Sequence, residues 1–101
     1  MVERFLDVTE YDSYSDFMQN FKVKVPKDFN FGYDVVDAWA AEEPDRTALI
    51  WTNPAGETRT FSFGELKTLT DKFATVLTQN GIGHGSRVML MLKRRWQFWV
   101  A

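Results

Sequence analysis

The run Arg87-Val-Met-Leu-Met-Leu92 constrains the fold of this chain more than any other feature. Five apolar residues follow one another in it without a polar residue between them. A strand that is apolar on both faces is typical of a parallel sheet with helices on two sides. The pattern therefore predicts a buried strand over about residues 87–92, which needs a covering layer on each face.

One covering helix is predicted over about residues 62–80. Ser62 and Glu65 have the spacing of a capping box, in which each side chain bonds to the backbone of the other residue. Asn80 and Gly81 form a suitable C-terminal cap. The apolar residues of one helix face are Leu66, Leu69, Phe73, Val76 and Leu77. This helix supplies one of the two layers.

The second layer is expected from a helix that begins near Arg95. The segment Lys93-Arg-Arg-Trp-Gln-Phe-Trp-Val-Ala101 turns from charged to apolar and contains no Gly, Asn or Pro that would close a helix. We therefore expect a truncated terminal helix, and we expect the chemistry of the protein to lie in residues beyond Ala101.

The remaining elements have shorter signals. Strand-forming residues at 47–52 and 58–63 flank the turn residues Asn53-Pro-Ala-Gly-Glu57 and predict an antiparallel hairpin over about residues 47–63. Tyr33–Glu42 is predicted as a helix with Asp34, Asp37 and Glu42 facing water, and a short helix is predicted within residues 13–21. The fold class is thus α/β, an incomplete layered unit. Residues 1–32 are predicted to form an N-terminal helix and an extended connector, and residues 33–101 to begin a larger domain.

Composition excludes several classes of function. The formal charge of −2 disfavours a nucleic-acid partner, and the absence of cysteine rules out disulfides and thiolate metal sites. No apolar run approaches the ~20 residues that span a bilayer, so no membrane partner is expected and the predicted location is cytoplasmic. Aromatic residues make up 16% of the chain. That share exceeds what one small core encloses, and the surplus is expected to form an exposed interface.

Five blocks in order resemble the opening of an adenylate-forming acyl-CoA synthetase of the AMP-binding enzyme family. The resemblance is strongest to the branch of acetyl-CoA and medium-chain synthetases. The blocks are Phe29-Asn-Phe-Gly-Tyr-Asp-Val-Val-Asp-Ala-Trp39, Pro44-Asp-Arg-Thr-Ala-Leu-Ile-Trp51, Thr60-Phe-Ser-Phe-Gly-Glu-Leu66, Gly81-Ile-Gly-His-Gly-Ser-Arg-Val88 and Leu92-Lys-Arg-Arg-Trp-Gln-Phe-Trp99.

This resemblance implies a ligase that converts a carboxylic acid and ATP, with Mg²⁺, to an acyl-adenylate and then transfers the acyl group to coenzyme A. It also implies a large N-terminal domain, of which residues 33–101 would be the start, and a small mobile C-terminal domain. The phosphate loop, adenine, ribose and catalytic lysine motifs of such enzymes do not occur in these residues. No catalytic, cofactor-binding or metal-binding residue is therefore assigned to this chain.

Two loop features resemble sites without matching them. The stretch Gly81-Ile-Gly-His-Gly-Ser86 has a helix before it and a strand predicted after it, the reverse of a dinucleotide fingerprint, and it ends in Ser-Arg rather than Lys-Ser. It is interpreted as a helix-to-strand connection with positive φ at Gly81 and Gly83. His84, the single histidine, has no ligand partner at suitable spacing and is interpreted as a solvated loop residue.

Two charge clusters also resemble sites without matching them. Lys93, Arg94 and Arg95 stand beside Trp96 and Trp99, a pattern compatible with phosphate contacts and ring stacking, but three cations at a strand end usually mark its exit into water. The acidic residues Glu42, Glu43 and Asp45 surround a proline and are interpreted as a solvated turn.

Two functions of different class follow. The first is an N-terminal fragment of an ATP-dependent acid–CoA ligase, inactive in isolation. The second is a short module without enzymatic activity that self-associates or binds a partner. In both cases we expect a homo-oligomer formed through the exposed strand edge and the truncated helix. A nucleic-acid module through residues 93–99 is a third, disfavoured reading.

Overall fold

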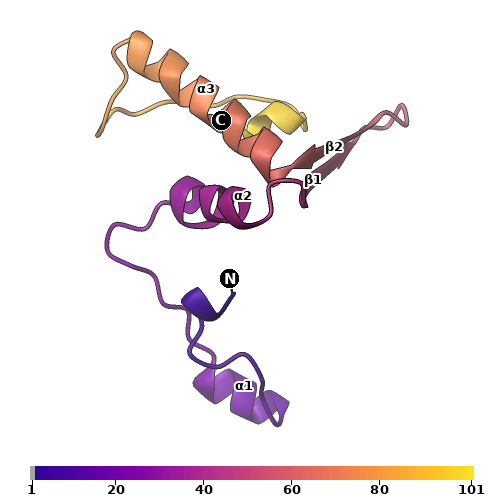
Figure 1. Cartoon of the computed structure of the whole chain (residues 1–101), viewed down its shortest axis with the longest axis vertical. Coiled ribbons are helices and arrows are strands. Elements are labelled where there is room, and N and C mark those ends of the chain that lie inside the picture. The colour runs from indigo at the N-terminus through magenta and orange to yellow at the C-terminus, as the bar shows by residue number, and fades with distance from the viewer. Residues whose placement is uncertain (1) are drawn as a thin grey trace. The chain divides into compact units, whose positions relative to one another are not determined.

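The computed structural model describes residues 2–101, which divide into two compact units, one ending at Asn30 and one formed by Phe31–Ala101. Three α-helices and one antiparallel hairpin make up the regular structure, with short helical turns beside them (Figure 1). The described residues contain no helix that is both long enough and apolar enough to cross a bilayer. The elements in chain order are η1 (Val2–Arg4), α1 (Tyr14–Asn20), η2 (Gly32–Asp37), α2 (Ala38–Glu42), β1 (Thr47–Thr52), β2 (Thr58–Ser62), α3 (Phe63–Gln79) and η3 (Trp96–Trp99).

The first unit is held by a short helix and a few aromatic contacts. The Ser13 hydroxyl accepts a hydrogen bond from the Asp16 amide at 3.1 Å and caps α1, which confirms the helix predicted within residues 13–21. Leu6 forms an isolated antiparallel bridge with Val23, and the Phe5 carbonyl accepts from the Lys24 amide at 2.8 Å. These few contacts make a small unit, so its side chains are mostly exposed.

The second unit begins with a helical segment that runs from η2 into α2. The π-helical first part, Gly32–Asp37, continues as α-helix to Glu42, so the helix predicted over Tyr33–Glu42 is confirmed. The prediction that Asp37 faces water was wrong, because its carboxylate accepts a hydrogen bond from the Lys67 ammonium at 3.1 Å. The wider π-helical turn was not predicted from the apolar spacing.

The hairpin β1–β2 has the predicted position and pairing. Trp51 lies opposite Arg59 and Leu49 lies opposite Phe61 in the antiparallel register. Its turn is closed by the Asn53 carbonyl, which accepts from the Gly56 amide at 3.0 Å, while Gly56 has φ +84°. A residue with a side chain is strained at that φ, which explains the glycine in the turn. The predicted hairpin over residues 47–63 is therefore confirmed.

Helix α3 begins with the complete capping box that the sequence predicts. Ser62 Oγ accepts from the Glu65 amide at 3.2 Å, and Glu65 Oε2 accepts from the Ser62 amide at 2.9 Å. At the other end Gly81 has φ +75°, and the Leu77 carbonyl accepts from the Ile82 amide at 3.0 Å. Both ends are satisfied by local bonds, so the helix predicted over residues 62–80 is confirmed.

The enclosed core of the second unit is small. The buried apolar side chains among the described residues are Val36 of η2, Phe61 of β2 and Leu66 of α3. Trp39 stacks on Phe63 with ring centroids 5.7 Å apart, at the edge of this core. Many other large apolar side chains stay exposed, which confirms the predicted surplus of aromatic surface.

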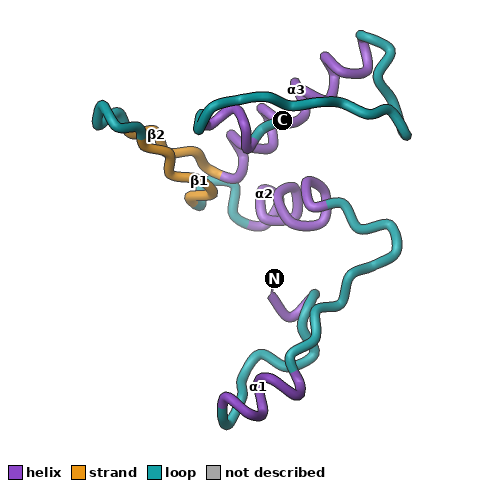
Figure 2. The backbone as a smooth tube through the Cα atoms, turned by 180° about the vertical axis from the view of Figure 1, so that it is seen from behind, coloured by secondary structure: helices purple, strands orange, loops and turns teal. Residues whose placement is uncertain are grey.

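The buried strand predicted over residues 87–92 is not formed. These residues form no regular element and pair with no strand, and all of them are exposed. The sheet of the described residues contains only β1 and β2, and a parallel strand needs a neighbour and two covering layers that residues 2–101 do not supply. In Figure 2 this segment runs back along α3 as a loop toward the hairpin.

A shorter element stands in place of the helix predicted to begin near Arg95. Trp96–Trp99 forms only a short 3₁₀ turn, η3, and its side chains are not buried. Isolated helices of a few residues are marginal in water, because one turn provides too few hydrogen bonds to offset the ordering of the backbone. The layered unit predicted from the sequence is thus a small mixed α/β unit with a hairpin and one long helix.

Candidate functional site

Arg59 of β2 contacts two aromatic rings, one from its own strand and one from the C-terminal segment. Its guanidinium carbon is 4.5 Å from the ring centroid of Phe61 and 4.5 Å from that of Trp96. The two rings are themselves 5.0 Å apart, at an angle of 42°. A guanidinium over an aromatic face is attracted by the ring quadrupole, so this contact binds the C-terminal segment to the hairpin.

A single hydrogen bond fixes the same segment at the other strand. Trp51 Nε1 of β1 donates to the Arg94 carbonyl oxygen at 3.0 Å. Since Trp51 and Arg59 are directly opposite each other in the hairpin, both attachments come from one cross-strand pair. The register of the hairpin therefore decides where residues 94–96 lie.

The attached segment and the hairpin turn line a groove with a volume of about 490 Å³. Two indoles, three cations and one carboxylate contribute to its walls. The carboxylate, Glu57, is already engaged, because its Oε2 accepts from Asn53 Nδ2 at 2.6 Å. The charged and aromatic lining residues are Trp51, Glu57, Lys93, Arg94, Arg95 and Trp96.

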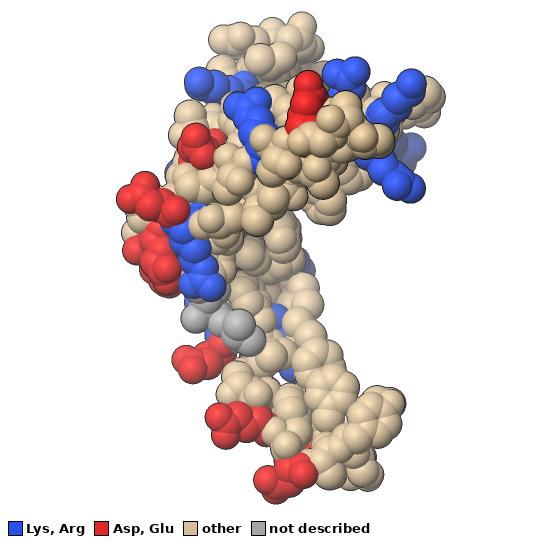
Figure 3. All heavy atoms as spheres, turned by 90° about the vertical axis from the view of Figure 1, so that its right-hand side faces the viewer, with Lys and Arg blue, Asp and Glu red and all other residues tan. Residues whose placement is uncertain are grey.

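The groove has the chemistry of a binding surface rather than a reaction centre. In Figure 3, Lys and Arg side chains stand at the upper right of the visible face with an acidic group beside them. None of the salt bridges within residues 2–101 involves Lys93, Arg94 or Arg95. Cations without carboxylate partners attract anions, whereas acid–base catalysis needs a paired acid and base within hydrogen-bond reach.

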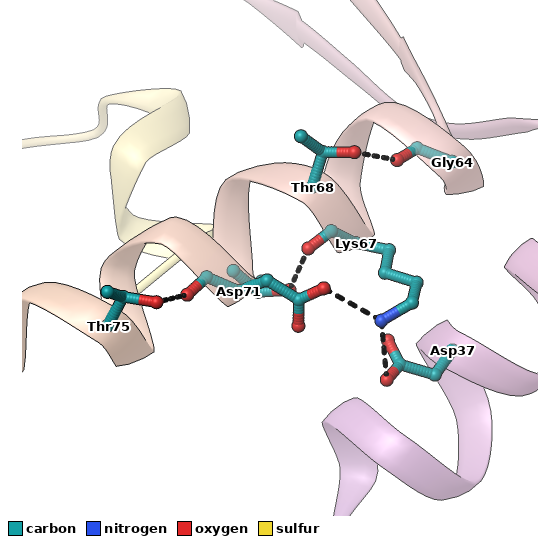
Figure 4. Close-up of polar contacts among 7 residues, drawn as sticks. Asp37, Gly64, Lys67, Thr68, Asp71 and Thr75 are labelled. Atoms are coloured by element: carbon teal, nitrogen blue, oxygen red, sulfur yellow. Dashed lines mark hydrogen bonds and ion pairs between the residues drawn. The ribbon is translucent and has the colours of Figure 1, made fainter. Parts of the chain in front are cut away.

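Lys67 has the one clearly displaced pKa among the described residues. A hydrogen bond to Asp71 Oδ2 at 2.8 Å and a second to Asp37 Oδ2 at 3.1 Å raise the pKa of Lys67 above its ordinary value of 10.5. Figure 4 shows its ammonium group between the two carboxylates, one on α3 and one on η2. A lysine that acts as base or nucleophile needs a lowered pKa, so Lys67 serves to join two helices.

The glycine-rich loop follows α3 as predicted, but it leads into the unpaired residues 87–92 rather than into a strand. Gly81 has positive φ as predicted, but the second positive φ belongs to Gly85, at +82°, and not to Gly83. The Ser86 hydroxyl accepts from the Gly83 amide at 3.1 Å, which closes the loop locally. His84 is exposed in this loop.

The acidic cluster after α2 is divided among separate contacts. Glu43 pairs with Arg46 at 3.3 Å, and Glu42 is exposed. Asp45 lies at a shallow depression of about 390 Å³ beside the start of α3. Within residues 2–101 no three His, Cys, Asp or Glu side chains come together in a way that could hold a metal ion.

The structure keeps most of the basic and aromatic cluster at residues 93–99 together. Lys93, Arg94, Arg95 and Trp96 do meet in one groove, while Trp99 is attached to Phe98 by an edge-on contact of 5.6 Å. The contributions of Arg59 and Trp51 were missed. The turn at Asn53–Glu57 sets the strand register that places Trp51 opposite Arg59. This turn was the sequence signal from which their pairing could have been predicted.

Comparison with known proteins identifies the family. Residues 36–101 match the model of the AMP-binding enzyme family, and the chain belongs to that family. The resemblance of the five sequence blocks to the AMP-binding enzyme family is thereby confirmed.

Individual relatives are acyl-coenzyme A synthetases. The chain is 37% identical over 97 residues to the human protein "Acyl-coenzyme A synthetase ACSM3, mitochondrial", which covers 90% of this chain and 17% of that protein. It is 40% identical over 82 residues to ACSM4 of Rattus norvegicus, covering 75% of this chain and 14% of that protein. Human ACSM1 is 36% identical over 83 residues, with 76% and 14% covered. The chain thus spans less than a fifth of the length of these relatives.

Proposed function

We propose that residues 33–101 form the beginning of the large N-terminal domain of an ATP-dependent acid–CoA ligase. The complete enzyme would convert a carboxylic acid and ATP to an acyl-adenylate and then to an acyl-CoA, using Mg²⁺. The observation that carries this proposal is the family match over residues 36–101. The similarity to proteins named acyl-coenzyme A synthetase supports the same reaction class.

The part assigned to these residues in the complete enzyme is that of a scaffold. Helix α3 is capped at both ends, and Phe61 of the hairpin and Leu66 of α3 are both buried. The groove beside the hairpin contains no acid–base pair among its lining residues, and Lys67 is held in its charged form. The isolated chain is therefore expected to form neither acyl-adenylate nor acyl-CoA.

A chimera tests the scaffold proposal directly. Residues 36–101 would replace the matching segment of full-length human ACSM3, and thioester formation from ATP, coenzyme A and a panel of carboxylic acids would be followed. We expect the chimera to retain activity within about an order of magnitude, because hydrophobic cores tolerate volume-conserving exchange. A chimera that folds, by circular dichroism and size exclusion, yet makes no thioester would contradict the proposal.

The isolated 101-residue chain provides the complementary measurement. Pyrophosphate exchange into ATP should stay at the level of buffer with every acid tested, while full-length ACSM3 serves as the active control. Acid-dependent exchange by the purified chain would show that it contains a complete adenylation site.

A second function is favoured by the exposed segment 87–92. We infer that, as a separate chain, the protein would act as a binding module without enzymatic activity, and that this segment would be covered by a second copy or another protein. The large apolar surface of Met89 and Met91, 86% and 87% exposed, supports this inference. Light scattering over a wide concentration range tests it, and a monomer at every concentration with no bound partner would contradict it.

The cytoplasmic location and the absence of nucleic-acid and membrane partners stay predictions from composition. The names of these relatives include the word "mitochondrial", which describes those proteins. Imaging of the tagged chain in cells, with fractionation of the same extract, would decide the compartment.

A further inference from the structure

The C-terminal end of α3 places an asparagine directly before a glycine. Asn80 is followed by Gly81, and both residues are exposed. The backbone nitrogen of a residue can attack the side-chain amide of an asparagine before it, and glycine obstructs this attack least because it has no side chain. The other asparagines precede a phenylalanine or a proline, and they are Asn20, Asn30 and Asn53. Asn80 is therefore the asparagine of this chain best suited to spontaneous deamidation.

Hydrogen bonds hold both reacting groups in the folded helix end. The Gly81 amide, which would attack, donates to the Thr78 carbonyl at 3.0 Å. The Nδ2 group of Asn80, which would leave, donates to the Val76 carbonyl at 2.8 Å. The Gly81 nitrogen cannot turn toward the Asn80 side chain while these two bonds are formed. The reaction therefore requires the last turn of the helix to open first.

The bonds that must open belong to a complete Schellman motif at the helix end. The Ile82 amide donates to the Leu77 carbonyl at 3.0 Å, and Gly81 has φ +75°. Apart from the chain neighbours of Gly81, a Cβ added there would meet no heavy atom of the described residues within 4 Å. No packed group thus obstructs Gly81 when the turn opens, and helix ends open more readily than a whole compact unit does.

We propose that Asn80 is a site of spontaneous deamidation, and that opening of the last turn of α3, rather than unfolding of the unit, sets its rate. In the open turn the Gly81 nitrogen loses its proton to solvent and forms a bond to Asn80 Cγ. The bond between Cγ and Nδ2 breaks, and Nδ2 takes up a proton from solvent and leaves as ammonia. Water then opens the succinimide ring at one of its two carbonyls, which gives aspartate or isoaspartate. The reaction needs no ligase activity.

Either product prevents the last turn of α3 from closing as before. Aspartate has no Nδ2 group to donate to the Val76 carbonyl, and its negative charge lies at the helix C-terminus, where the carbonyl groups repel it. Isoaspartate also adds a carbon to the main chain, so the Gly81 and Ile82 amides no longer fit their acceptors. The modification therefore loosens the start of the glycine-rich loop at residues 81–86.

Mass spectrometry of the folded chain tests the site. Trypsin releases residues 73–87 as one peptide, because it cuts after Lys72 and Arg87. The whole chain and a synthetic copy of this peptide would be incubated side by side at mildly alkaline pH, and the conversion of Asn80 would be followed in both. We expect Asn80 to react in the folded chain at least about tenfold more slowly than in the peptide, because two hydrogen bonds must open first. The other three asparagines of the chain are internal controls and should stay unchanged over the same period.

Substitutions at opposite ends of α3 separate opening of the last turn from unfolding of the unit. Gln79→Gly weakens the last turn without changing either reacting residue, and Gln79→Ala is its matched control. Each rate would be divided by the rate of the peptide with the same substitution. Gln79→Gly should then react about fivefold faster than Gln79→Ala, because glycine is the weaker helix former. Ser62→Ala weakens the first turn of the same helix and should leave the rate at Asn80 unchanged.

Four results would overturn the proposal. Asn80 could stay intact in the folded chain after the peptide has reacted completely, or it could react as fast as in the peptide. Gln79→Gly and Gln79→Ala could react at equal rates, or Ser62→Ala could accelerate the reaction as much as Gln79→Gly. Circular dichroism would confirm that each variant retains α3. The ligase assignment does not depend on these results, because the chimera tests it separately.

The Asn80→Asp variant tests the effect of the modification on the helix end. Hydrogen exchange at the Gly81 amide should be faster in this variant than in the unchanged chain, because the aspartate does not close the turn. Unchanged exchange at that amide would contradict the loosening of the loop.

Discussion

The segment from β2 through α3 and the segment after residue 84 lie in the same compact unit, but they hold their conformation by different means. Between residues 58 and 81 the strand is paired, the helix is capped at both ends, and Phe61 and Leu66 are buried. From Arg87 to Leu92 the backbone makes no hydrogen bond within the described residues, and the side chains are exposed. The comparison shows that regular structure forms here where hydrogen-bond partners are close in sequence, because such contacts carry a small cost in loop-closure entropy.

The largest expected effect comes from removing the central aromatic side chain of the ordered segment. Phe61→Ala would create a cavity and lose the contact with Trp96, destabilising the second unit by about 3–5 kcal/mol. For so small a core this is enough to unfold it. Urea denaturation followed by far-ultraviolet circular dichroism would measure the change.

Met89→Ala is the matched control for that substitution, since its side chain is 86% exposed. The free energy of unfolding should change by less than about 0.5 kcal/mol. If Met89→Ala destabilised the chain as much as Phe61→Ala, the terminal segment would be a packed part of the core, and the contrast between the two segments would fail.

A smaller effect is expected at the start of α3. Ser62→Ala removes the hydroxyl that accepts from the Glu65 amide and should cost about 1 kcal/mol. Hydrogen exchange at the Glu65 amide should become faster. Ser15→Ala, inside α1, should leave that amide unchanged, and an equal increase in both variants would mean that the capping box does not hold the helix.

Trp51→Phe tests the attachment of the terminal segment. It keeps the aromatic surface and removes the donor to the Arg94 carbonyl, so about 0.5–1.5 kcal/mol of local stability should be lost. Trypsin should then cut after Arg94 and Arg95 a few times faster. Ile50→Val, next to it on the exposed face, should not change the rate, and an unchanged rate in Trp51→Phe would show that this bond does not restrain the segment.

The smallest expected effect is the pH dependence that Lys67 confers. Its pKa is raised in the folded chain, so its contribution is fully present below pH 10.5 and is lost as the pH rises through the higher folded pKa. Stability should therefore fall more steeply above pH 10.5 in the unchanged chain than in Lys67→Met. Lys72→Met should keep the steeper fall. Identical curves of stability against pH for all three chains would show that Lys67 does not cause this pH dependence.

The amount of structure that could be predicted differs between these parts for a physical reason. The Ser62–Glu65 cap, the Asn53–Glu57 turn and the Gly81 terminus are specified by residues within a few positions of one another, and each was predicted correctly. Residues 87–92 carry the correct apolar pattern for a covered strand, but neither a neighbouring strand nor two layers exist in residues 2–101. An apolar pattern can indicate that a strand needs a neighbour and covering layers, but it does not itself provide them.

The groove beside the hairpin likewise has one part that could be predicted from the sequence and one part that could not. Lys93, Arg94, Arg95 and Trp96 are adjacent in the sequence and were recognised there as a basic and aromatic cluster. Their position against Trp51 and Arg59 could not be read from that cluster, because it depends on contacts across more than thirty residues of chain. The Asp37–Lys67 pair was missed for the same reason.

The amino-acid order alone determined the local elements of this protein, because caps, turns and apolar periodicity act over a few residues, and its five blocks also revealed membership in the AMP-binding enzyme family. Only the tertiary structure decided that Arg59 contacts both Phe61 and Trp96, that Lys67 joins two helices, and that residues 87–92 are exposed and form no strand. These features depend on which residues far apart in the sequence come into contact. The free energy of such contacts is not determined by any single stretch of the chain.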